Sequence, residues 1–325
     1  TAICDIDPKR IDIALELLKK DGRKKPMVFG KDENDYLNLL DAPDVDAVII
    51  ATPWLWHTKM AVAAMKAGVY AGLEVSASQT IEECWDLVNT HEATGTHMMF
   101  LENVNFRRDV MAVLHMVKQN VFGEMLHYRC GYQHDLREVK FNNGEQPYGG
   151  GVEFGEKGLS EARWRTKHSV LRNGDTYPTH GVGPIAAMAD INRGNRFTSM
   201  TANATKAVGL HKYVVDHGGE DHPNAKIKFK QGDVITSMIE CANGETIIVT
   251  HDSYVAFYMA DKCGIILDQS LKQYDVPYKI HHEPNSIEVA KFLNRGVFVN
   301  VRVVSNDCAV HQLKHEELGL IEGKL

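Results

Sequence analysis

A tyrosine and a histidine three residues apart form the pair of side chains in this sequence best suited to chemistry. They are Tyr177 and His180 in the stretch GDTYPTHGVGP. A spacing of three puts both on one side of a helical turn, and we expect a helix to begin here with Thr179 as its N-cap. A phenol and an imidazole can supply an acid and a base near neutral pH. The same pair also suits an ordinary hydrogen-bonded structural role, so both interpretations stand at this point.

The elements that must position this pair begin with alternating strand and helix patterns over the first 123 residues. The apolar run VDAVIIATP (45–53) predicts a buried strand, and residues 10–20 and 57–68 have helical spacing, the latter ending at Gly68. Thr80 and Glu83 have the spacing of a capping box. This alternation predicts an α/β dinucleotide-binding domain, residues 1–123, with a Rossmann-type, doubly wound parallel sheet.

The pattern changes in the remainder of the chain. A long, Gly-rich stretch (about 135–176) is expected to be irregular, and strand patterns then dominate from residue 197 onward. We predict an α+β substrate-binding and oligomerisation domain over 124–325, built on an open, mainly antiparallel sheet. Residues 285–325 are a candidate segment for packing back on the first domain.

Asp5 follows a short apolar run, AIC, and precedes a helical pattern. In a dinucleotide-binding unit an acid at the end of the second strand binds the ribose hydroxyls, about 20 residues after a Gly-rich turn. We therefore expect the first strand, the Gly-rich turn and the first helix to lie upstream of residue 1. The charges of Asp5 and Asp7 would favour NAD over NADP. A simple turn-forming role for Asp5 is the alternative.

Composition excludes several classes of protein. The net charge of −7 argues against a nucleic-acid or anionic-membrane surface, and no apolar run approaches the roughly 20 residues that cross a bilayer. Six scattered cysteines suit free thiols better than disulfides or zinc. His217, Glu220, Asp221 and His222 lie close together, but no matching ligand set occurs elsewhere, so we expect no metal site.

Several longer stretches resemble a known family. AICDID, ATPWLWH, ENVNFRRDVMAVLHMV, GYQHDLREVKFN and RWRTKHSVLRNGDTYPTHGVGP are similar to the Gfo/Idh/MocA oxidoreductase-like family. Within it they look like the branch of NAD-dependent α-N-acetylgalactosaminidases, glycoside hydrolase family 109. The similarity is continuous from residue 1 to about 252 and weaker beyond.

This resemblance implies site residues. It makes His180 and Tyr177 the catalytic acid and base, with the division of roles left open. It implies NAD contacts at Asp5, Trp54, Leu55, Trp56, His57, Glu74, Val75, Asn103 and Tyr177. It implies sugar contacts at Tyr132, Arg165, Tyr177, Pro178, Thr179 and His180, with Tyr254 or Tyr258 as a further candidate. For Trp54 and Trp56, ordinary packing is the alternative interpretation.

The segment Glu74-Val75-Ser76 distinguishes two possible activities. Sugar dehydrogenases of the wider family carry Glu-Lys-Pro there, and the Lys shuttles the proton in alcohol oxidation. Its absence favours a glycosidase that oxidises the sugar, eliminates the aglycone, adds water and reduces the sugar again. An NAD-dependent sugar oxidoreductase and a non-catalytic sugar-binding relative are the alternatives. We expect a glycan with terminal N-acetylgalactosamine as substrate, no nucleic-acid or membrane partner, and a homo-oligomer; the sequence leaves the cellular location open.

Overall fold

The computed structural model describes residues 1–325 except 133–134, 252–262, 268–269, 276–301, 306–310, 316–318 and 324–325. The chain forms two compact units, Thr1–Ser253 and Tyr254–Leu325. The predicted boundary between residues 123 and 124 lies inside the first unit and stays a prediction, as does the packing of residues 285–325. No helix among the described residues has the length and apolar character needed to span a membrane.

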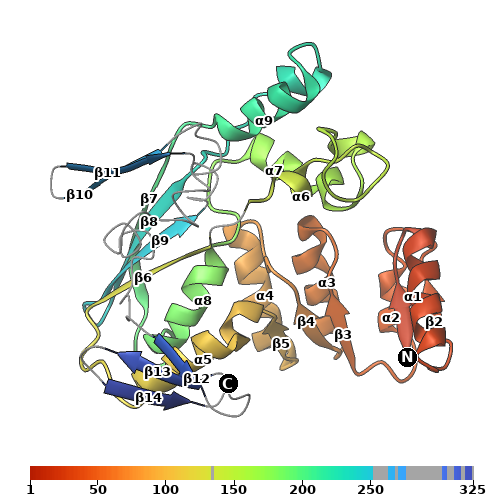
Figure 1. The fold of residues 1–325 in the computed structure, drawn as a ribbon. Helices are drawn as coiled ribbons and strands as arrows, with labels where there is room; N and C mark the ends of the chain where they lie inside the picture. The colour runs from red at the N-terminus through yellow and green to blue at the C-terminus, as the bar shows by residue number, and fades with distance from the viewer. Residues whose placement is uncertain are drawn as a thin grey trace. The chain divides into compact units, whose positions relative to one another are not determined.

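The first part of the Thr1–Ser253 unit alternates strands and helices, as predicted (Figure 1). Its elements are β1 (Ala2–Cys4), α1 (Pro8–Lys20), β2 (Met27–Phe29), α2 (Tyr36–Leu40), β3 (Ala47–Ile50), α3 (Trp54–Lys66), β4 (Tyr70–Leu73), α4 (Ile81–Thr94), β5 (Met98–Phe100), the 3-10 helix η1 (Asn103–Phe106) and α5 (Arg108–Lys118). All strand pairs are parallel, in the orders β1-β2 and β3-β4-β5. The prediction of a Rossmann-type α/β fold is confirmed.

A core of small and branched apolar side chains holds α3 against the β3-β4-β5 sheet. Ala61, Ala64 and Met65 of α3 are fully buried with Ala71 and Leu73 of β4. The small alanines let helix and sheet approach closely, while the apolar run of β3 supplies Ile50 to the same core. This packing fixes the carboxyl ends of β3 and β4, where the predicted cofactor contacts begin.

Two helix ends follow local sequence signals. Thr80 and Glu83 form the predicted capping box at the start of α4. Gly68, with φ of +75°, follows the C-cap of α3, as predicted from its αL tolerance. The start of α3 differs, because the helix begins at Trp54 rather than at residue 57. Pro53 provides an extended N-cap, and the helix runs directly from the end of β3.

The second part of this unit carries a four-stranded sheet in the order β6-β9-β8-β7. Its elements are β6 (His127–Tyr132), α6 (Arg137–Lys140), α7 (Arg165–Leu171), α8 (Pro178–Met188), β7 (Phe197–Ala204), α9 (Gly209–Gly218), β8 (Ile235–Cys241) and β9 (Thr246–His251). The β7–β8 and β8–β9 pairs are antiparallel and β6–β9 is parallel, so the mainly antiparallel prediction is confirmed. β8 alternates buried and exposed residues, and its buried face packs toward α8.

The stretch 135–176, which we expected to be irregular, contains α6, α7 and two short 3-10 helices. The fully buried Asn142 organises its loops: its side chain donates to the carbonyls of Pro147 and Leu159 and accepts from the N–H of Gly144. Such side-chain-to-backbone bonds replace a regular ladder. They leave little periodic signal in the sequence, which explains the difference.

The Tyr254–Leu325 unit contributes only antiparallel strand pairs among its described residues. β10 pairs with β11, and β12, β13 and β14 form a three-stranded sheet. Their bounds are Cys263–Leu267, Ser270–Asp275, Arg302–Ser305, His311–His315 and Gly319–Gly323.

Candidate active site

The Tyr177–His180 pair lies at the start of α8, where we predicted that a helix begins. The predicted N-cap is wrong by two residues: the helix begins at Pro178 and Tyr177 occupies the cap position. Proline fits the first helical position because its fixed φ suits a helix and its missing N–H is not needed there. Asp175 accepts the N–H of Tyr177 at 2.8 Å, which holds the chain at this turn.

His180 is held by a carboxylate that the sequence analysis did not name. Oε1 of Glu102 lies 2.7 Å from Nδ1 of His180, and both side chains are largely buried. Glu102 follows β5, and the same Oε1 accepts the N–H of Val104 at 3.1 Å. Because an ionised carboxylate can only accept, Nδ1 carries the hydrogen in this bond. Nε2 of His180 is therefore the ring atom able to accept a proton when the imidazole is neutral.

Burial alone would raise the pKa of Glu102. The hydrogen bonds from His180 and the Val104 N–H, with the nearby Thr179 hydroxyl and the charge of His180, outweigh it, so the pKa lies below its ordinary value. The carboxylate is thus the stable form beside the imidazole at neutral pH.

Two tyrosine rings lie against His180, one from the same helix start and one from a distant strand. The ring of Tyr132, at the end of β6, lies 4.4 Å from the His180 ring, centre to centre. The Tyr177 ring stacks on His180 at 5.3 Å with only 6° between the planes, and Tyr132 lies 5.7 Å from Tyr177. The three-residue spacing therefore brings the predicted acid and base into direct contact, and β6 adds a second phenol.

Arg165 and Trp54 extend this cluster through their contacts with Tyr177. The guanidinium carbon of Arg165 lies 4.6 Å from the Tyr177 ring centre and 5.3 Å from that of Trp54. Arg165 forms an ion pair with Glu161, one turn earlier. The described residues provide no acceptor for its buried Nε. A largely buried, fixed guanidinium beside aromatic rings is suited to an oxygen-rich ligand.

The two tryptophans after β3 have different surroundings. Trp54 is 5% exposed and packs edge-on against Tyr177 and Trp164, while Trp56 contacts Tyr36 and lies under the ammonium of Lys59. Only Trp54 therefore joins the cluster around the predicted acid and base.

His57 and Leu55 have different environments from each other. The ring nitrogens of His57 lie 2.7 Å from the Ser76 carbonyl and 2.6 Å from the Thr52 carbonyl, with the residue 1% exposed. This side chain joins the carboxyl ends of β3 and β4. Leu55 is exposed.

The other predicted cofactor residues lie at the carboxyl ends of strands. Glu74 and Val75 follow β4, and Val75 packs against the cluster of Trp54 and Tyr177. Asn103 is exposed at the start of η1. Asp5 follows β1 and is exposed, with its carboxylate accepting the N–H of Asp7 at 2.8 Å. Tyr254 and Tyr258 lie outside the described residues.

Sequence reasoning missed Glu102, Glu161 and Trp164. The Glu161–Arg165 spacing of four residues was a usable signal for an ion pair on a helical turn. Glu102 adjoins the predicted Asn103, but no local pattern links it to a histidine 78 residues away. Among the described residues, no group of three His, Cys, Asp or Glu side chains is placed to hold a metal ion.

Comparison with known proteins gives consistent matches. Residues 106–257 match the family description "Glycosyl hydrolase 109, C-terminal domain". A "Glycosyl hydrolase family 109 protein" of Parabacteroides distasonis is 58% identical over 257 residues, which cover 78% of this chain and 55% of that protein. An "Alpha-N-acetylgalactosaminidase" of Tannerella forsythia is 57% identical over 256 residues, with the same coverage. The chain spans about half the length of the curated relatives it matches.

Solved structures show the same fold at low identity. The apo form of a levoglucosan dehydrogenase matches with a TM-score of 0.55 and 22% identity, covering 78% of this chain and 58% of that chain. The apo scyllo-inositol dehydrogenase of Lactobacillus casei matches with a TM-score of 0.52 and 13% identity, covering 77% and 59%.

Proposed function

Because this chain belongs to the glycosyl hydrolase 109 family, we propose that it acts in a glycosidase that releases terminal α-linked N-acetylgalactosamine with NAD as cofactor. The observation that carries the proposal is one contact set. Tyr177 stacks on the ring of His180, which is hydrogen-bonded to Glu102, and Tyr177 also lies against Trp54 and Val75, at the carboxyl ends of β3 and β4. Proton-transfer groups thus adjoin the edge of the sheet where open α/β folds bind dinucleotides.

The residues present suit NAD. Asp5 offers an exposed carboxylate at the end of β1 for ribose hydroxyls, and its charge favours NAD over NADP. Val75 and Trp54 would border the nicotinamide, with Glu74 and Asn103 at neighbouring strand ends. When bound, NAD supplies reversible removal of hydride from C3 of the sugar, which makes the proton on C2 acidic. The solved levoglucosan dehydrogenase complex with NADH has a TM-score of 0.52 to this chain. A fold of this kind therefore binds NADH in that protein, which supports the proposed cofactor.

We assign each proton transfer of this reaction to one of the side chains around His180. Glu102 holds Nδ1–H, so Nε2 of His180 is the atom to take the proton from C2. We assign Tyr177, stacked on that ring, as the acid that protonates the departing glycosidic oxygen. Arg165 and Tyr132, which both contact Tyr177, would orient sugar oxygens. In the second half of the reaction the roles are reversed. Tyr177 takes a proton from the water that adds to C1, and His180 returns a proton to C2.

The proposal is tested by measuring whether the hydrogen on C2 of the released sugar exchanges with solvent. Hydrolysis of an α-N-acetylgalactosaminide in D₂O should give sugar deuterated at C2 with no net NADH, measured by NMR and by absorbance at the NADH band. His180→Ala should lower hydrolysis about 10²- to 10⁴-fold while NAD still binds, and Tyr177→Phe should slow it severely. His115→Ala, an exposed histidine on α5, is the matched control.

Two results would contradict the proposal. Efficient cleavage without exchange at C2 would exclude the redox route and point to two carboxylates. Net accumulation of NADH with free sugars would instead indicate a sugar oxidoreductase.

A further inference from the structure

His180 is followed on α8 by two glycines, Gly181 and Gly183, in the stretch THGVGP. Glycine is unfavourable inside a helix, because it loses more conformational freedom on folding than alanine does. α8 nevertheless carries both glycines within its first two turns. The contacts that a side chain would make at each position give the reason.

Gly183 faces Glu102 and η1, the elements that follow β5. A β-carbon built on Gly183 would lie 2.9 Å from Cγ of Glu102 and 3.1 Å from Oδ1 of Asn105. Non-bonded carbon atoms pack at about 3.5 to 4.0 Å, so a methyl group here would displace the Glu102 side chain. Gly183 comes three residues after His180, which puts both on one side of the helix. The missing side chain therefore leaves the space through which Glu102 reaches Nδ1 of His180.

Gly181 faces β6 and limits how far α8 can move. A β-carbon built on Gly181 would lie 3.1 Å from the backbone nitrogen of Gly131 and 3.3 Å from Sγ of Cys130. Helix and strand thus approach each other backbone to backbone. Because such a close-packed contact has no spare volume, α8 has little freedom to shift when a group is added where it faces η1.

The backbone of α8 holds His180 incompletely. Pro184 lies inside the helix and has no N–H to donate to the carbonyl of His180, four residues earlier. The turn that carries the imidazole therefore lacks one helical hydrogen bond, and its place depends more on the neighbouring elements. Among the described elements α8 contacts β6, η1, α5 and β9, and its two glycines face the first two of these.

We propose that Gly183 is a positioning residue for His180. Its lack of a side chain lets the Glu102 carboxylate lie beside the imidazole, and the resulting hydrogen bond keeps the hydrogen on Nδ1. Nε2 is then the ring atom left to take a proton. The role of Gly183 in catalysis rests on the proposed glycosidase function, whereas its effect on the His180 hydrogen bond does not.

The ring nitrogens of His180 can be observed without NAD or substrate. In the full chain with isotope-labelled histidine, nitrogen NMR at a pH where the imidazole is neutral shows which ring nitrogen carries the hydrogen, and His180→Ala identifies the signals. We expect the Nδ1–H form in the unchanged chain and a mixture with the Nε2–H form in Gly183→Ala. Gly174→Ala is the matched control, because a β-carbon there has nothing within 4 Å and Gly174 lies between α7 and α8. Unchanged His180 signals in folded Gly183→Ala would overturn the proposal.

A double-mutant cycle separates displacement of Glu102 from general damage to the fold. Gly183→Ala should lower kcat about 10²-fold with little change in KM, as expected when a catalytic group is misplaced. Glu102→Ala removes the Cγ atom that the new methyl group would meet, so Gly183→Ala should cost little further activity in that background. The same cycle, measured as the free energy of unfolding in urea, gives the coupling where activity is too low to compare. Fully additive losses in both measurements would overturn the proposal.

The two proposals can fail separately. If the unchanged chain releases no sugar but its His180 signals change as expected in Gly183→Ala, the glycosidase function fails and the positioning role of Gly183 is supported. If the unchanged chain is active and Gly183→Ala has the same kcat and the same His180 signals, only the positioning role fails.

Discussion

At the scale of single residues, the Glu102–His180 bond determines which ring nitrogen can act. The carboxylate is 3% exposed, so burial by itself would raise its pKa, yet its hydrogen bonds lower that pKa below the ordinary value. A buried carboxylate that remains charged orients the imidazole and stabilises its protonated form. In the proposed mechanism Glu102 acts through His180, as a positioning residue.

Glu102→Gln should lower kcat on the order of 10²-fold with little change in KM, because the amide keeps the shape but not the charge. Glu102→Asp should recover part of the loss, and Glu138→Gln, outside the site on α6, is the control. The pKa of Glu102 is lower in the folded chain than in the unfolded chain. The contribution of this carboxylate to the free energy of unfolding should therefore be complete above about pH 4.5 and should be lost as the pH falls through the lower folded pKa. A rise in KM with unchanged kcat would contradict a role in positioning His180.

At the scale of elements, α7 connects the second part of the Thr1–Ser253 unit to its first part, which carries the parallel sheets. It carries Arg165 and His168, and both contact the ring of Trp54 on α3. The Thr166 hydroxyl donates to the Lys140 carbonyl at 2.5 Å, which ties α7 to α6. Burial, then the charges of Arg172 and Arg165, lowers the pKa of His168 to about 4. The folded state therefore favours neutral His168 on α7.

This packing predicts a pH dependence of stability. Between about pH 6.5 and pH 4 the unfolded chain binds a proton at His168 and the folded chain does not, so the free energy of unfolding should decrease as pH falls through this range. His168→Gln should remove part of that slope, measured by urea unfolding at several pH values. His115→Gln, a change at an exposed histidine, should leave the slope unchanged. If the slope were also unchanged in His168→Gln, protonation of His168 would not affect the stability of the fold.

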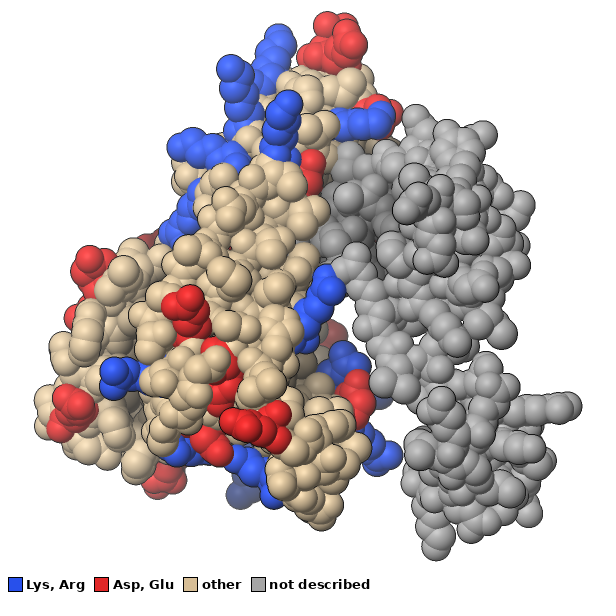
Figure 2. Space-filling model, turned by 90° about the vertical axis from the view of Figure 1, so that its left-hand side faces the viewer, with Lys and Arg blue, Asp and Glu red and all other residues tan. Residues whose placement is uncertain are grey.

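At the scale of the whole molecule, the β6-β9-β8-β7 sheet carries a row of exposed side chains on one face among the residues that the structure describes. Thr236, Met238 and Glu240 of β8 are exposed on it, next to Ser199 and Thr201 of β7. In Figure 2, which looks at this side, Lys and Arg gather at the top and the middle is mostly uncharged. Such a face is suited to contact with a second sheet.

We propose that this face mediates a homo-oligomer. Light scattering at micromolar concentration should give a mass above 36.4 kDa, and Met238→Lys should shift the population toward monomer. Met116→Lys is the control, because Met116 is an exposed methionine on α5. A wild-type mass equal to that of one chain would contradict the proposal.

The amino-acid sequence by itself determined the features that depend on neighbours along the chain. The Thr80–Glu83 capping box, the end of α3 before Gly68 and the alternation of β8 follow from hydrogen bonds and periodicities within a few residues. The Tyr177–His180 pair belongs to the same class, because one helical turn is enough to bring the two rings together. The α/β alternation also specified the fold class.

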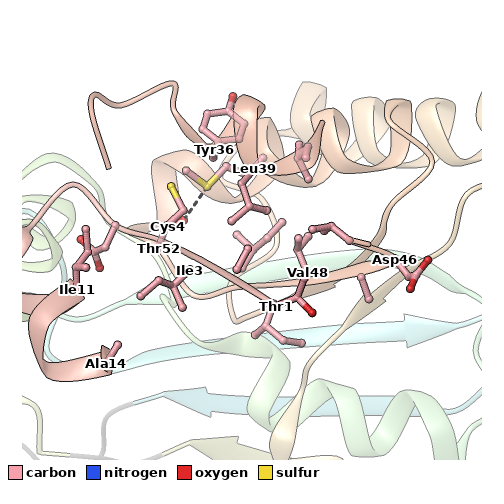
Figure 3. A pocket seen from close by; sticks show the side chains of 18 of the residues that line it. Thr1, Ile3, Cys4, Ile11, Ala14, Tyr36, Leu39, Asp46, Val48 and Thr52 are labelled. Carbon is pink, nitrogen blue, oxygen red and sulfur yellow. Dashed lines mark hydrogen bonds between the residues drawn. The ribbon is translucent and has the colours of Figure 1, made fainter. Parts of the chain in front are cut away.

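Only the tertiary structure decided which side chains contact partners from distant parts of the sequence. Glu102 reaches His180 across 78 residues, and packing places Trp54 in the site while its near neighbour Trp56 contacts α2. A cavity of about 730 Å³ between β1 and β3 likewise depends on how two separate sheets are spaced (Figure 3). Such contacts arise where elements far apart in sequence share one buried volume. No local propensity encodes that volume, because it is set by the close packing of all the elements around it.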